Sequence, residues 1–218
     1  MDDEYYAILT VIDCSPDSSA ELGDHLRDAG FMTDTERYRT DPDTDAPQLT
    51  PGQDLTAYGI NADGVQGLLD ELTALDHKLA YVARTEIDRG EPGDLFVRVP
   101  GLTWQGPCDR SGTPMVDADT VAAIAAEPDP GIRTELLDAS TGHSVRTALA
   151  ALQYTRDLLA LAADLGIGEG DLDDAVHTAF GEQAASVNNG GIPAQLALLT
   201  EGTRDRDAIR ALLENLRP

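Results

Sequence analysis

The chain is poor in positive charge. Its 218 residues include 40 aspartates and glutamates but only 15 lysines and arginines, so its formal net charge at pH 7 is −25. Lys78 is the only lysine. Proteins that bind a phosphate backbone use lysine and arginine to displace its counterions, and a strongly negative field repels nucleic acid and anionic membranes. We therefore expect no direct nucleic-acid partner and no membrane partner.

Metal-ligating residues and long apolar runs are also scarce. The two cysteines, Cys14 and Cys108, form no CxxC pair, and the four histidines stand alone in the sequence. No spacing typical of a metal site follows from them. No apolar run reaches the roughly 18 residues of a membrane helix, and the N-terminus, Met-Asp-Asp-Glu, has the wrong charge for a signal peptide. We expect a cytoplasmic protein with no metal and no cofactor.

The acidic residues that remain are unevenly distributed and consist mainly of aspartate. Net charge is −11 over residues 1–54, −9 over residues 55–142 and −5 over residues 143–218. A functional acidic surface would produce such a pattern. A GC-rich genome would also favour arginine over lysine and abundant aspartate, and a salt-adapted proteome would be similarly acidic. The sequence does not decide between a functional acidic surface and an acidity that only reflects the host.

The first hundred residues have the pattern of two β-α-β units. A capping box of Ser18 and Glu21 predicts the start of a helix that ends at Gly30. The periodicity of apolar residues predicts a second helix over Asn61–Asp76. Strands are predicted at Tyr5–Ile12, Phe31–Thr40, Leu55–Ile60, Leu79–Ile87 and Leu95–Val99. This order predicts an α+β fold, a ferredoxin-like β-α-β-β-α-β sandwich with an extra strand, over residues 1–100.

Residues 101–142 are predicted to connect this sandwich to a helical part. The stretch Pro100–Met115 contains three glycines and three prolines, which is typical of a surface loop. Its Trp104 would either pack back onto the core or serve as a contact anchor, and we expect it to pack. A helix is predicted over Val116–Glu127 with Asp117 as its N-cap, followed by a turn or short helix at Gly131–Ser140.

Residues 143–218 are predicted to form a cluster of about four helices. The segment His143–Leu165 confines its strongly polar residues to a narrow stripe, which predicts a largely covered, central helix. Three shorter helices are expected over Asp171–Val187, from Pro193 to about Leu199, and over Arg206–Leu216.

Three short motifs resemble known binding sites, but structural roles in loops and at helix ends explain them better. Asp41-Pro-Asp-Thr-Asp45 has the alternating aspartates of a calcium loop, yet Ala46 and Gly52 stand where glycine and glutamate are required. Residues 188–191, Asn-Asn-Gly-Gly, lack the lysine and glycine spacing of a phosphate loop. The aspartates at 171, 173 and 174 are favoured by a helix N-terminus.

A candidate ligand site lies around the Gly/Pro-rich segment. Cys108 and His143 would be a thiol–imidazole pair if the fold brought them within hydrogen-bond reach. A turn with a surface ion pair explains Asp109 and Arg110 equally well. No catalytic motif is recognisable. The candidate ligand residues are Trp104, Cys108, Asp109, Arg110 and His143.

Three functional hypotheses remain. The first is an interaction or regulatory protein that binds a basic protein partner, in its sharpest form as a DNA mimic. The second is a small-ligand-binding protein or enzyme with its site near Trp104–Arg110, where the sandwich meets the helical part. The third is an accessory protein whose acidity only reflects its host. For the first, the candidate partner-binding residues are Asp17, Glu21, Asp24, Asp28, Asp41, Asp43 and Asp45.

Overall fold

The computed structural model describes residues 5–33, 49–87, 92–167, 210, 211 and 214. The chain divides into two compact units, Met1–Leu149 and Ala150–Pro218. Among the helices of the described part, none is long and apolar enough to cross a membrane.

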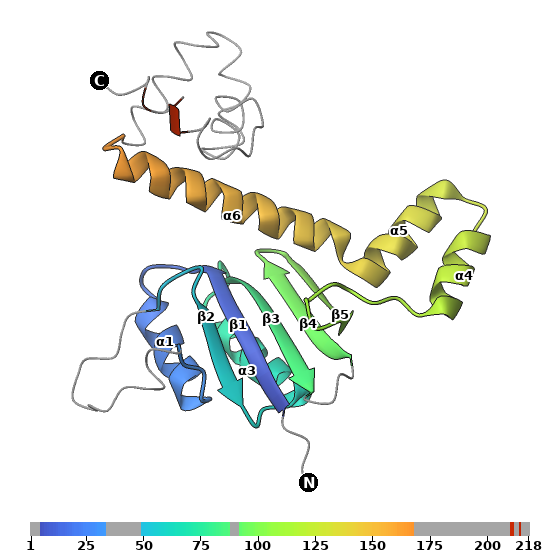
Figure 1. Ribbon diagram of the computed structural model, residues 1–218, viewed down its shortest axis with the longest axis horizontal. Helices are drawn as coiled ribbons and strands as arrows, with labels where there is room; N and C mark the ends of the chain where they lie inside the picture. Colours follow the sequence, from blue (N-terminus) through green and yellow to red (C-terminus); the bar gives the residue numbers. More distant parts are fainter. Residues whose placement is uncertain (1–4, 34–48, 88–91, 168–209, 212–213, 215–218) are drawn as a thin grey trace. The chain divides into compact units, whose positions relative to one another are not determined.

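The first unit is built on a five-stranded antiparallel sheet with the order β2-β1-β3-β4-β5 (Figure 1). The strand β1 pairs with β2 on one side and with β3 on the other. The hairpins β3–β4 and β4–β5 extend the sheet from there. The strands are β1 Tyr5–Asp13, β2 Asp54–Tyr58, β3 Ala80–Ile87, β4 Gly93–Val99 and β5 Leu102–Cys108.

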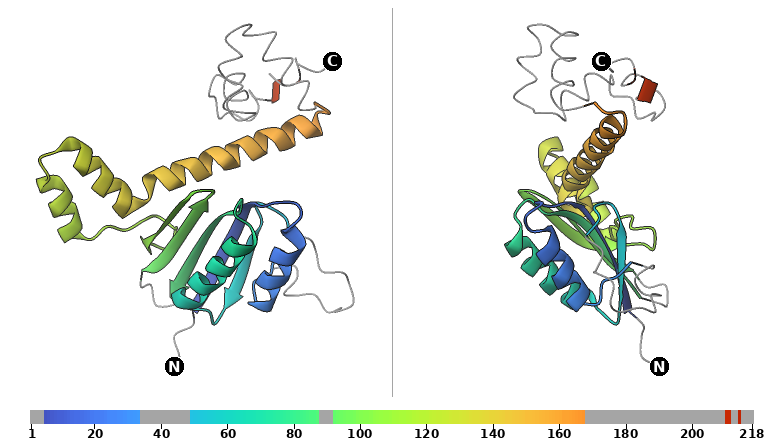
Figure 2. Two further views of the ribbon diagram at one scale, coloured as in Figure 1. Left: turned by 180° about the vertical axis from the view of Figure 1, so that it is seen from behind. Right: turned by 90° about the vertical axis from the view of Figure 1, so that its left-hand side faces the viewer.

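Two helices, α1 (Ser19–Asp28) and α3 (Ala62–Leu75), cover one face of this sheet (Figure 2). Side chains alternate along a strand, so every second residue of β1 points towards these helices. Their contacts with α1 and α3 form the main core. Its members from the strands and helices include Ala7, Leu9, Val11, Leu22, Leu26, Leu55, Ala57, Val65, Leu69, Leu72, Tyr81, Ala83 and Phe96.

The predicted α+β class is confirmed, but the ferredoxin-like order is not. The segment predicted as a second strand, Phe31–Thr40, forms an isolated bridge between Met32 and Thr56, and residues 34–48 lie outside the described part. The five-stranded order contains no strand from that segment and has β5 in addition to the expected extra strand β4, so it does not match the ferredoxin-like order exactly.

The loop predicted at Pro100–Met115 is wrong for its first half. Residues Leu102–Cys108 form the edge strand β5, in register with β4 from Val99–Leu102 to Gly93–Cys108. Pro100 and Gly101 make the two-residue connection, and Gly101 takes a φ of 83°, a backbone conformation in which glycine pays no Cβ penalty. Pro107 is tolerated because an edge strand does not use every N–H in the ladder.

The predicted capping box of Ser18 and Glu21 is also wrong. Ser18 is the N-cap of α1, but its side chain makes no capping hydrogen bond. Its hydroxyl instead donates to the carboxylate of Asp76 at 2.8 Å and to the Ser15 carbonyl at 3.2 Å. Asp76 lies at the end of α3 and is 5% exposed. The Ser18 hydroxyl therefore bonds a carboxylate that is distant in the sequence and does not cap its own helix.

Three further helices follow the sheet: α4 (Ala118–Ala126), α5 (Pro130–Thr141) and α6 (His143–Asp164). The predicted N-cap Asp117 is confirmed, since its carboxylate accepts a hydrogen bond from Thr120 N at 2.8 Å. Trp104 of β5 is half-buried and donates from its indole Nε1 to the Ala139 carbonyl of α5 at 2.8 Å. This hydrogen bond thus connects α5 to the edge strand β5.

The helix α6 passes from the first unit into the second. It covers most of the segment predicted as the first C-terminal helix. The helices predicted over 171–187, 193–199 and 206–216 lie almost wholly outside the described residues.

Candidate functional site

The outer surface of α1 and α3 is densely acidic. Arg27 is the only lysine or arginine in these two helices, and it pairs with Asp24 of its own helix at 2.9 Å. The two helices are in contact with each other. We call the exposed acids that they carry, together with Asp17 just before α1, the acidic helix face. The exposed carboxylates of this face are Asp17, Glu21, Asp24, Asp28, Asp63, Asp70 and Glu71.

The spacing of these acids follows from helix geometry. Glu21, Asp24 and Asp28 are separated by three and four residues, which places them on one side of α1. With a rise of about 1.5 Å per residue, they lie roughly 4.5 and 6 Å apart along the helix axis. The other predicted partner-binding residues, Asp41, Asp43 and Asp45, lie outside the described residues.

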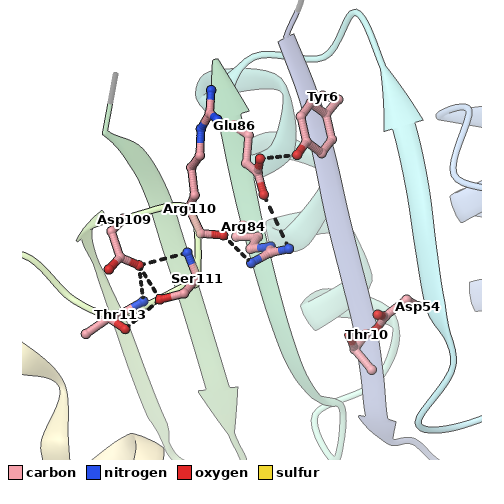
Figure 3. A network of polar contacts seen from close by, with 9 residues as sticks. All are labelled: Tyr6, Thr10, Asp54, Arg84, Glu86, Asp109, Arg110, Ser111 and Thr113. Atoms are coloured by element: carbon pink, nitrogen blue, oxygen red, sulfur yellow. Dashed lines mark hydrogen bonds and ion pairs between the residues drawn. The ribbon is translucent and has the colours of Figure 1, made fainter. Parts of the chain in front are cut away.

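A polar network lies on the sheet face opposite α1 and α3 (Figure 3). The Tyr6 hydroxyl of β1 donates to Glu86 of β3, and Glu86 pairs with Arg84 at 3.3 Å. Arg84 also donates to the backbone carbonyl of Arg110 at 2.7 Å. Burial and the hydrogen bond to Glu86 raise the pKa of Tyr6 to about 12, so Tyr6 keeps its proton at neutral pH. These three side chains pair their polar groups with one another across β1 and β3, and Arg84 connects them to the loop after β5.

That loop is stabilised by Asp109. One oxygen of its carboxylate accepts hydrogen bonds from the Ser111 amide at 2.8 Å, the Ser111 hydroxyl at 2.6 Å and the Thr113 amide at 2.9 Å (Figure 3). The hydrogen bond from the Ser111 hydroxyl is the largest of the effects that lower the pKa of Asp109. The carboxylate is engaged in closing a turn.

No hydrogen bond of the described residues joins Cys108 and His143, the candidate thiol–imidazole pair. Cys108 is 1% exposed, and burial, aided by the nearby Asp94 carboxylate, raises the pKa of its thiol to about 11. A nucleophilic cysteine needs the thiolate. His143 is exposed at the start of α6, and none of the hydrogen bonds of the described residues connects it to Cys108.

A shallow polar groove, which sequence reasoning missed, runs between α3 and the β3–β5 part of the sheet. Its volume is about 230 Å³. The cationic side chain of its lining, Arg98, is engaged within the protein, because the guanidinium donates hydrogen bonds to the Leu79 and His77 carbonyls at 3.2 and 3.4 Å. The lining includes Gln66, Asp70, Thr73, Tyr81, Arg98 and Gln105.

The described ranges contain no group of three or more histidine, cysteine, aspartate or glutamate side chains placed to hold a metal ion. The motifs at 171–174 and 188–191 lie outside the described residues. Comparison with protein-family models, with curated proteins and with solved structures finds no match to this chain.

Proposed function

We propose that the protein is an interaction protein that binds a basic protein partner through the acidic helix face. The observation that carries this proposal is the charge of that face: seven exposed carboxylates with one arginine, itself paired with Asp24. A one-signed surface of this kind attracts a cationic partner and accelerates its association.

The acidic helix face fits a general basic protein surface better than it fits the DNA-binding site of an enzyme or repressor. Arg27 lies among the acids of α1 and pairs with Asp24, whereas a mimic of the phosphate backbone gains nothing from an arginine in its charge array. The axial spacing of roughly 4.5 to 6 Å on α1 is also wider than the 3.4 Å per phosphate along one DNA strand. Both observations favour a general basic partner over the DNA-mimic form of the proposal.

An enzymatic or small-ligand function near Trp104–Arg110 has less support. Trp104 is bonded to α5, Cys108 is buried, and Asp109 closes its own turn. A catalytic group needs a free functional end within reach of a substrate, and these contacts leave none to Trp104 or Cys108, while one oxygen of the Asp109 carboxylate is used in its turn.

Two further parts of the proposal concern fold and location. The Met32–Thr56 bridge places the segment after α1 beside β2, which supports a ferredoxin-like core extended by β4 and β5. We also propose that the protein is cytoplasmic.

The test compares two variants of equal charge. The face variant carries Glu21→Gln, Asp28→Asn and Asp70→Asn. The control carries Glu214→Gln, Asp157→Asn and Asp164→Asn, which removes three exposed carboxylates from other parts of the chain. Binding to a fluorescent lysine-rich peptide is measured by anisotropy at low salt and at about 0.15 M salt, where the Debye length is about 8 Å.

We expect the face variant to bind about tenfold more weakly than the wild type at low salt, since each exposed pair contributes up to about 1 kcal/mol. The control should lose much less, and the difference should shrink as salt rises. Equal losses in both variants would show that total charge, and not this face, attracts the peptide, as expected of a protein whose acidity only reflects its host.

A further inference from the structure

The helices α4 and α5 bury very few side chains. Ile124 is the only buried residue of α4, and α5 has none. Scattered exposed aliphatic side chains are normal on any protein, but here four occur within 17 residues on two helices that pack together. They are Val121 at 52%, Ile132 at 46%, Leu136 at 40% and Leu137 at 51% exposed. We call this surface the apolar hairpin face.

The hairpin is well formed despite its small core. Asp117 caps α4, and Asp129 caps α5 by accepting hydrogen bonds from Gly131 N at 2.7 Å and Ile132 N at 3.2 Å. The guanidinium of Arg133 donates twice to the Glu127 carbonyl, at 3.1 and 2.6 Å, and so joins the start of α5 to the end of α4. Helix caps of this kind stabilise a helix by about 1 kcal/mol each.

The far end of the hairpin is anchored to the sheet. The indole of Trp104 donates to the Ala139 carbonyl, and its ring packs so closely on Gly142 that a Cβ there would lie 2.4 Å from Cδ2. The exposed face is therefore held in place before any partner arrives, and preorganisation of this kind lowers the entropic cost of binding.

The charge around the apolar hairpin face defines its partner. Residues 117–141 contain six acids and one base, and that base, Arg133, is engaged with the Glu127 carbonyl. A second copy of the chain would bring the same negative charge to the contact, and like charges placed together are strongly unfavourable. A cationic partner is complementary. Ile132 and Leu136 are four residues apart on one side of α5, the spacing at which an amphipathic helix docks.

We propose that the apolar hairpin face of α4 and α5 is a docking surface for a basic amphipathic helix of another protein. The apolar side of that helix packs on Val121, Ile132, Leu136 and Leu137, and its lysines and arginines face the surrounding acids. This inference rests on the proposed function in one respect, that the partner is basic, and it adds a second surface and a shape requirement.

The test uses two fluorescent peptides of the same leucine and lysine composition. One places its leucines at helical spacing, and the other has the same residues scrambled so that no apolar side forms. Both are titrated into full-length wild type, into a hairpin variant (Leu136→Gln with Leu137→Gln) and into a matched control (Leu102→Gln with Tyr58→Gln). The control removes two side chains that are 46% and 65% exposed elsewhere in the unit. Far-UV circular dichroism verifies that each variant is folded.

We expect the wild type and the control to bind the amphipathic peptide about tenfold more tightly than the scrambled one, because side chains that are already about half-buried gain only part of a full burial. The hairpin variant should bind both peptides equally. The face variant of the previous section should weaken both peptides by a similar factor and preserve the preference.

Three results would overturn the docking surface. Equal binding of both peptides by the wild type, weakened in the face variant, would refute the docking surface and leave the proposed function standing. No binding of either peptide would refute both. A hairpin variant that changes the mass of the unliganded protein in light scattering, or lowers its melting temperature well below that of the control, would show that a second copy or the chain itself covers the face.

Discussion

The carboxylate of Asp76 joins two loops that are far apart in the sequence, and its removal tests the packing of α1 against α3. Its oxygens accept hydrogen bonds from the Ser15 amide at 2.5 Å, the Ser15 hydroxyl at 2.9 Å, the Ser18 hydroxyl at 2.8 Å and the Lys78 amide at 2.9 Å. Asp76 sits at the C-terminal end of α3, where the helix dipole disfavours negative charge. The four donors therefore have to outweigh an unfavourable position.

We expect Asp76→Ala to destabilise the unit by about 2–4 kcal/mol. Net contributions of hydrogen bonds to a charged group are about 1.5–3 kcal/mol, but four bonds to one carboxylate are not additive. Ser15 and Ser18 are also partly exposed, so water can replace some of what they lose. Asp76→Asn retains an acceptor oxygen and should cost about half as much. Asp70→Ala, at an exposed position of the same helix, should change stability by less than about 0.5 kcal/mol.

The same carboxylate predicts a pH dependence. Burial alone would raise the pKa of Asp76, but the hydrogen bonds from Ser15, Ser18 and Lys78 outweigh it and lower the pKa below its ordinary value of 3.8. A group with a lowered pKa in the folded state stabilises the fold fully above its ordinary value and loses that contribution as pH falls through the folded value. The difference between wild type and Asp76→Asn should therefore be complete at pH 7 and shrink below pH 3.8.

Urea unfolding followed by tryptophan fluorescence measures both effects. Trp104 is the only tryptophan and lies within Met1–Leu149, so its emission reports on the unit that contains Asp76. A free energy of unfolding for Asp76→Ala equal to that of Asp70→Ala, or a difference between wild type and Asp76→Asn that stays constant with pH, would refute the role assigned to this carboxylate.

Two further predictions concern the edge of the sheet. Gly142→Ala should destabilise the unit by about 2–4 kcal/mol, because Gly142 has a φ of 61° and a Cβ there would lie 2.4 Å from Trp104 Cδ2. Gly101→Ala, at a φ of 83° with nothing within 4 Å of the added Cβ, should cost only about 1 kcal/mol. Equal losses of stability in urea unfolding would contradict the packing of Trp104 on Gly142. Cys108, buried and with a pKa of about 11, should resist iodoacetamide at about pH 8 in the native protein and react after unfolding; peptide mass spectrometry measures this, and equal rates in both states would show that the thiol is accessible.

Local sequence signals predicted the helices of the first unit well. The apolar stripe of α3 and the Asp117 cap of α4 both arise within a few residues, so pattern alone identified them. The capping box at Ser18 failed because its competitor, Asp76, lies 58 residues away. Local reasoning has no access to a partner at that distance.

The candidate site was only partly predictable for the same reason. The exposed acids of α1 follow from its helical period, so three of the named residues, Glu21, Asp24 and Asp28, could be placed on one side of that helix. The strand β5 was missed because its glycine and proline content is typical of a loop, whereas pairing with β4 determines its conformation. The network of Tyr6, Arg84 and Glu86 required the register of β1 with β3. The alternation of core and non-core residues along both strands was the one signal that could have indicated it.

The position of β1 between β2 and β3 has a consequence for how the chain folds as it is synthesised. Tyr5 pairs with Ile87, and Thr10 with Asp54 and Val82, so β1, which precedes both neighbours in the chain, can pair with both only after β3 has been synthesised. Pairings of such long sequence separation slow folding, and an unpaired apolar strand is prone to aggregate in the interval. We expect the dense negative charge of residues 1–54 to keep nascent copies of that strand apart through mutual repulsion, before any partner is met.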